Sequence, residues 1–150
     1  MTPSEVRAVK RRLETYQDLL AMAKEKDKEA LLMQVKYDTI AGAKAIRYDR
    51  EPGGSGSGRS KDSIYCEIFD RQREADLKAA KYRAQADQIR LFIDRIEDED
   101  KDLLIRAYID GERYWKIGES LSYSKDGIRR KIDRCLEQVP ATLAEASGLL

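Results

Sequence analysis

The sequence predicts an all-α fold: a long antiparallel helical hairpin that resembles a coiled coil, followed by a C-terminal unit of three helices. Of 150 residues, 38% are charged and 41% hydrophobic but only 7% aromatic, which is typical of long amphipathic helices. Apolar residues recur at steps of three and four over two long stretches. The densest run of proline and glycine, at 52–58, lies between these stretches.

The first helix is expected to run from Pro3 to about Ala41. Thr2 suits the N-cap, and proline is favoured in a first helical turn. Asp27 and Gln34 interrupt the apolar stripe, so a bend or fraying is expected near the charged Asp27. The stripe consists of Val6, Val9, Leu13, Tyr16, Leu20, Ala23, Ala30, Tyr37 and Ala41.

Residues at about 42–61 are expected to form a flexible loop, because Pro52 and the glycines that follow cannot sustain a helix. The run GGSGSG lacks the Lys-Ser/Thr ending and the preceding buried strand of a phosphate-binding loop. Nucleotide binding is therefore not expected.

A second long helix is expected from Asp62, with Asp62 or Ser63 as its cap. Its stripe would extend for roughly 50 Å, too long to be buried alone. Folding back on the first helix would cover it, with small residues at 75, 79 and 86 allowing close approach and Gln72 fixing the register. The same stripe could also recruit a second subunit. The stripe consists of Tyr65, Ile68, Gln72, Ala75, Ala79, Tyr82, Ala86, Ile89, Ile93 and Ile96.

The chain has no histidine, which excludes the usual zinc sites and histidine-dependent nucleophiles. Cys66 and Cys135 are expected to be reduced and partly buried. No paired groups suited to catalysis stand out, so an enzyme, a metal and a cofactor are not expected. No apolar run approaches the roughly 20 residues of a membrane span, and the N-terminus lacks a signal-peptide core. A cytoplasmic protein without a membrane partner is expected.

The hairpin is expected to occupy residues 1–97, a three-helix domain 98–139, and a tail 140–150. Acidic residues from Asp98 to Asp102 suit the first turn of a helix that ends near Ile109, where Asp110-Gly111 stops it. In the tail, Thr142 and Glu145 could form a capping box, or the segment could be loose.

The spacing within Arg113–Val139 predicts a helix-turn-helix. Tyr114, Ile117 and Leu121 fall on one helical face, and only Ser122-Tyr123 separates this helix from the next. Two helices joined so tightly must cross closely, which explains a glycine at Gly118. Ser124 would cap the second helix, whose buried stripe is Ile128, Ile132, Cys135, Leu136 and Val139.

The exposed face of this last helix predicts contact with double-stranded DNA, because such helices read bases with their N-terminal residues while flanking groups hold phosphates. The alternative is an ordinary solvated helix face. The candidates for base contact, in the helix that begins at Ser124, are Lys125, Asp126, Arg129 and Arg130. The candidates for backbone contact are Arg113, Lys116, Ser122, Tyr123 and Arg134.

This C-terminal segment resembles region four of sigma factors. The family's pattern is an apolar helix, an aromatic residue before an Ile-Ala-type pair, a leucine, a short turn and a Ser/Thr-capped basic helix. Here these are Leu103 to Tyr108, Trp115, Ile117-Gly118, Leu121, and Ser124 onward. Ser122 replaces the family's usual glycine, and Tyr123 replaces its small aliphatic residue.

Over about residues 5–139 the layout resembles the ArpU/RinA-like regulators of prophages of Gram-positive bacteria, including Tyr48-Asp49 before the Gly/Ser-rich run. This resemblance implies a transcription regulator of phage late genes that acts on DNA, with RNA polymerase as a candidate partner and a homodimer or higher oligomer formed through the long helices. Two alternatives stay open: a small terminase-type DNA-packaging subunit of a phage, and a coiled-coil interaction protein that does not bind DNA.

Overall fold

The computed structural model describes residues 1–46 and 61–150, which form helices joined by short connections and contain no strand. The predicted all-α class is confirmed. The chain divides into two compact units: one combines Met1–Ala21 with Tyr82–Leu150, and the other comprises Met22–Lys81.

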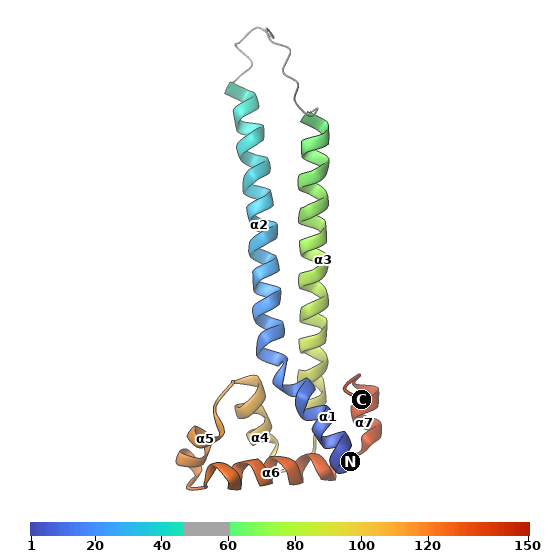
Figure 1. The fold of residues 1–150 in the computed structure, drawn as a ribbon, viewed down its shortest axis with the longest axis vertical. Coiled ribbons are helices and arrows are strands. Elements are labelled where there is room, and N and C mark those ends of the chain that lie inside the picture. Colours follow the sequence, from blue (N-terminus) through green and yellow to red (C-terminus); the bar gives the residue numbers. More distant parts are fainter. Residues whose placement is uncertain (47–60) are drawn as a thin grey trace. The chain divides into compact units, whose positions relative to one another are not determined.

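The unit Met22–Lys81 contains parts of two long helices, α2 (Tyr16–Ile46) and α3 (Lys61–Asp94). Within this unit, the two helices lie side by side and run in opposite directions (Figure 1). Small side chains dominate the contact, which lets the two backbones approach closely. The buried residues are Ala23, Ala30, Ile68, Ala75 and Ala79.

Polar and aromatic pairs hold the register between these two helices. The side-chain amide of Gln72 donates a hydrogen bond to the Gln34 amide oxygen at 3.2 Å. The ring of Tyr37 lies 5.3 Å from that of Tyr65 and 5.1 Å from that of Phe69, measured between centroids. Sliding the helices by one turn would break this hydrogen bond between two partly buried amides.

The helix ends in this unit differ from those expected. Helix α2 continues to Ile46, because its last residues, AGAKAI, are mostly good helix formers. Helix α3 begins at Lys61, so Asp62 and Ser63 lie inside its first turn and neither is the cap. An acidic residue in that turn is favoured by the helix dipole. The rest of the expected loop, with Tyr48-Asp49 and GGSGSG, lies outside the described residues.

In the other unit, α1 (Pro3–Glu14) begins as expected at the Thr2 cap. The Glu5 amide donates to the Thr2 hydroxyl at 3.4 Å, and the Thr2 amide donates to the Glu5 carboxylate at 2.7 Å. The second bond lowers the pKa of Glu5. The expectation of one continuous helix to Ala41 is wrong, because the chain breaks at Thr15, whose amide and hydroxyl both donate to the Arg12 carbonyl. The bend that was expected near Asp27 therefore lies at Thr15.

The acidic connection leads into α4 (Lys101–Leu104) and the π-helical turn η2 (Ile105–Ile109). The helix therefore starts later than the expected Asp98, but it ends where expected. Gly111 has a φ of +70°, a backbone conformation that favours glycine, and it terminates the segment. The amide of Asp110 donates to the Ile105 carbonyl at 2.9 Å, closing the wide turn.

Helix α5 (Tyr114–Leu121), α6 (Lys125–Gln138) and α7 (Ala141–Ala146) complete this unit. In the view of Figure 1, α5 lies by the N-terminal end of α6 and α7 by its C-terminal end. The core draws on every helix of the unit, including Val9 of α1 and Phe92 of α3, both fully buried. The segment 98–139 thus shares one core with both ends of the chain.

The C-terminal tail is folded and packed. Ala144 is fully buried, and only 4% of the Leu149 side chain is exposed. The expected capping box of Thr142 and Glu145 is wrong, because Pro140 is the N-cap of α7 and no side chain caps this end. Proline with its fixed φ suits the entry to this short helix.

The two cysteines occupy different environments. Cys135 is buried in α6, and this burial raises the pKa of its thiol to about 12. Cys66 is exposed on α3, so the expectation that it is partly buried is wrong. Both are free thiols, as expected.

Replacing Leu136 by alanine should lower the free energy of unfolding by about 2–5 kcal/mol, because its side chain is fully buried and leaves a cavity. Leu91→Ala, at a half-exposed position of the same unit, should change it by less than about 0.5 kcal/mol. Denaturant unfolding followed by circular dichroism measures both. Equal losses would contradict the core described above.

Candidate nucleic-acid interface

The turn between α5 and α6 brings two backbones into close contact. A Cβ atom at Gly118 would lie 2.4 Å from the carbonyl oxygen of Tyr123, a distance that real Cβ atoms essentially never show. The Tyr123 amide in turn donates to the Gly118 carbonyl at 2.8 Å. The close approach expected at Gly118 is therefore to the backbone of the turn itself, and this contact requires a glycine there.

Ser122 lies in the left-handed region, with φ 59° and ψ 38°. This conformation costs a residue with a side chain roughly 1–2 kcal/mol and favours glycine. It lets the chain leave α5 and enter α6 after only two more residues. Within the described residues, it is the one residue other than glycine with a positive φ.

Ser124 caps α6 as expected. Its backbone is extended, and its hydroxyl oxygen accepts a hydrogen bond from the Gly127 amide at 3.0 Å. A Cβ at Gly127 would lie 3.2 Å from this same oxygen, so the cap itself favours glycine there. The carboxylate of Asp126 lies in the first turn, where the helix dipole stabilises a negative charge.

The apolar stripe of α6 is buried as expected, with Ile128, Ile132 and Leu136 fully covered. Ile117 of α5 is also fully buried, but 42% of the Leu121 side chain is exposed. Leu121, which was expected on the same helical face as Ile117, is therefore not buried with it.

Every residue predicted to contact DNA is exposed: Arg113 is the N-cap of α5, Lys116 lies on α5, and the others lie in the turn or on α6. The site residues are Arg113, Lys116, Ser122, Tyr123, Ser124, Lys125, Asp126, Arg129, Arg130 and Arg134. The N-terminal turns of α6 hold Lys125 to Arg130 together. Arg134 lies about 13 Å further along the helix axis than Lys125, so it is not part of this cluster.

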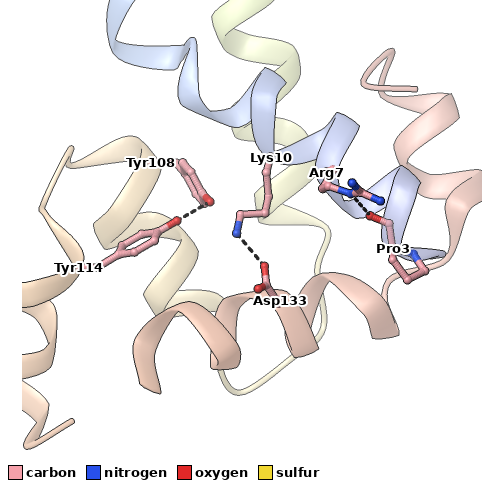
Figure 2. Close-up of polar contacts among 6 residues, drawn as sticks. All are labelled: Pro3, Arg7, Lys10, Tyr108, Tyr114 and Asp133. Atoms are coloured by element: carbon pink, nitrogen blue, oxygen red, sulfur yellow. Dashed lines mark hydrogen bonds and ion pairs between the residues drawn. The ribbon is translucent and has the colours of Figure 1, made fainter. Parts of the chain in front are cut away.

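Ion pairs remove some charges from the surface of α6. Lys10 of α1 reaches Asp133 with a separation of 2.7 Å (Figure 2). Lys131 lies 3.5 Å from Asp100 and 4.7 Å from the centre of the Tyr123 ring, and these neighbours raise its pKa. Among the described residues, no carboxylate forms an ion pair with Arg129 or Arg130. These two arginines keep their charge available.

Sequence reasoning did not include Trp115 among the site residues. It is the single tryptophan of the chain, and 46% of its side chain is exposed. Together with Arg113 and Lys125 it lines a hollow of about 510 Å³. An exposed tryptophan between basic residues was the available signal, since such rings usually find a partner.

Hydrogen bonds hold the residues that form the wall of this hollow. The hydroxyls of Tyr108 and Tyr114 lie 2.8 Å apart and share a hydrogen bond (Figure 2). Burial, and then this bond, raise the pKa of Tyr108. The side-chain amide of Gln17 donates to the Ile109 carbonyl from the other side. The first residue of α5 is thereby anchored to the core.

Within residues 1–46 and 61–150, no group of three acidic or cysteine side chains is placed to hold a metal ion. No helix in these ranges has the length and apolar composition needed to cross a bilayer. Comparisons with protein-family models, with curated proteins and with solved structures found no match.

Gly118→Ala should lower the free energy of unfolding by about 1–3 kcal/mol, even though alanine favours helices, because the backbone of the turn must move. Glu119→Ala, the exposed neighbour on the same helix, should have little effect. Chemical denaturation measures the difference. A Gly118→Ala variant as stable as Glu119→Ala would contradict the close contact.

Ser122→Gly should act in the opposite direction and stabilise the unit by about 0.5–1 kcal/mol, because glycine adopts the left-handed conformation without strain. Differential scanning calorimetry would detect the higher melting temperature. Ser120→Gly, inside α5, is the matched control and should destabilise it. Stabilisation by both variants would argue against the turn geometry.

Proposed function

We propose that this protein is a sequence-specific, DNA-binding transcriptional regulator and not an enzyme. The observation that carries the proposal is the α5–α6 pair: a two-backbone contact at Gly118 and a left-handed Ser122 hold α6 with its basic side chains exposed. In a helix-turn-helix, the second helix enters the major groove and its first turns meet base edges.

The charged residues on and around α6 are suited to two kinds of contact, with bases and with phosphates. Arg129 and Arg130 carry guanidinium forks that can bond guanine with two hydrogen bonds. Asp126 can accept a hydrogen bond from cytosine and repels phosphates, so it favours selectivity over affinity. Arg113, Lys116 and Arg134 supply phosphate contacts on either side. Binding should therefore weaken strongly as salt rises.

The proposal extends to the regulation of phage or prophage late genes in the cytoplasm, with RNA polymerase as a candidate partner. This part rests on the resemblance of the sequence to sigma factor region four and to ArpU/RinA-like regulators. A homodimer through the long helices would place two copies of α6 on one duplex, and half-site spacing would then follow the protein's symmetry.

A second candidate function is an interaction protein that works through the α2–α3 pair. Three large apolar side chains on α2 support it: Leu31, Leu32 and Val35 are 64%, 63% and 52% exposed. Exposed apolar clusters often mark contact surfaces. A folded protein that fails to bind duplex DNA at low salt would favour this candidate.

The experiment that tests the proposal is selection of bound duplexes from a random pool, followed by sequencing. Enrichment of one motif supports sequence-specific binding. Retention of DNA without any motif would reduce the function to non-specific binding, and no retention at low salt would reject it. The terminase-type alternative predicts a ring of many subunits, which sedimentation would reveal.

Arg130→Ala should weaken binding to the selected duplex by about 1–3 kcal/mol if this side chain contacts a base, and should relax the preference at one position. Fluorescence anisotropy against selected and scrambled duplexes measures both effects. Arg73→Ala, an exposed arginine on α3, is the control for loss of one charge. Equal losses on the two duplexes would assign Arg130 to a phosphate.

A further inference from the structure

Helix α1 carries a basic surface that the proposed function does not use. A groove of about 490 Å³ lies between α1 and α6, within one compact unit. Arg7, Lys10 and Arg11 line it from α1, and Arg129 lines it from α6. The groove therefore adjoins the base-reading turns of α6 through a residue that both surfaces share.

The ion pair between Lys10 and Asp133 joins the two helices that line this groove. The other cations of the groove are not neutralised by this pair. The two paired groups lie 2.7 Å apart, and 15% and 35% of their side chains are exposed. The pair neutralises itself and ties α1 to α6, so the remaining cations are held at a fixed place beside α6. Those cations are the guanidinium groups of Arg7, Arg11 and Arg129, all of them on exposed residues.

The two arginines of α1 are spaced for a shared ligand. Arg7 and Arg11 are four residues apart, so they lie on one face of the helix. The Nε of Arg7 donates to the Pro3 carbonyl at 3.3 Å, which holds the side chain along the helix and leaves its two terminal nitrogens available (Figure 2). A planar guanidinium with two parallel donors matches the geometry of a phosphate better than the ammonium group of a lysine does.

We infer that Arg7 and Arg11 of α1 bind phosphates of the DNA backbone, next to Arg129 and the site read by α6. The inference rests on the proposed function and adds to it a second contact surface from the other end of the chain. Glu14 and Glu137 also line the groove and oppose a polyanion, which limits the gain in affinity. Contacts with phosphates add affinity without base specificity.

The test compares the double variant Arg7→Gln/Arg11→Gln with the control Arg12→Gln/Arg90→Gln, which removes the same charge from exposed residues outside the groove. Binding to selected and scrambled duplexes is measured by fluorescence anisotropy over a range of salt. The groove variant should bind both duplexes about tenfold more weakly, with a salt dependence reduced by about two ions. The motif that it selects should stay unchanged.

Glu137→Gln provides a change in the opposite direction, because removing this carboxylate from the groove should tighten binding to both duplexes. Circular dichroism and thermal unfolding verify that each variant folds. If the groove variant matches its control, α1 does not contact DNA although the proposed function stands. If the wild-type chain binds no duplex at low salt, the proposed function fails and the inference fails with it.

Discussion

The arrangement of α5 and α6 depends on one contact, that between Gly118 and the carbonyl oxygen of Tyr123. Any side chain at Gly118 would force these backbones apart. The left-handed Ser122 and the cap at Ser124 make the turn short enough for this contact, while Ile117 and Ile128 fill the space behind it. The way in which α6 is held against α5, and hence which of its faces is exposed, thus depends on a few backbone atoms.

Two ion pairs then decide which charges α6 presents. Lys10 neutralises Asp133, and Asp100 holds Lys131 near the ring of Tyr123. Both pairs are only partly buried, with 15–35% of each side chain exposed, so their contribution to stability is modest. Their larger effect is on the surface, because Asp133 is neutralised while Arg129 and Arg130 stay exposed without an ion-pair partner in the described part of the chain.

Sequence patterns predicted the structural features that depend on residues close together in the chain. The Thr2 cap, the buried stripe of α6 and the role of Gly118 follow from spacing alone. Two kinds of feature were not predicted: a local bond whose outcome the spacing does not determine, and a contact between residues that lie far apart in the chain. The break at Thr15 uses a local bond that competes with helix continuation, and the pairing of Lys10 with Asp133 joins residues far apart in the chain. Trp115 was missed as a site residue because it was interpreted only as the aromatic residue of the sigma-factor pattern, although Arg113 and Lys116 lie on either side of it.

The proposed function requires that the N-terminal turns of α6 contact DNA. The most direct measurement is a titration of the isotope-labelled full chain with a selected duplex of about 20 base pairs, followed by amide chemical shifts. The account predicts the largest changes between Ser122 and Arg130, and small ones at the Gln34–Gln72 contact of the other unit. Changes concentrated on α2 and α3, with α6 unaffected, would contradict it.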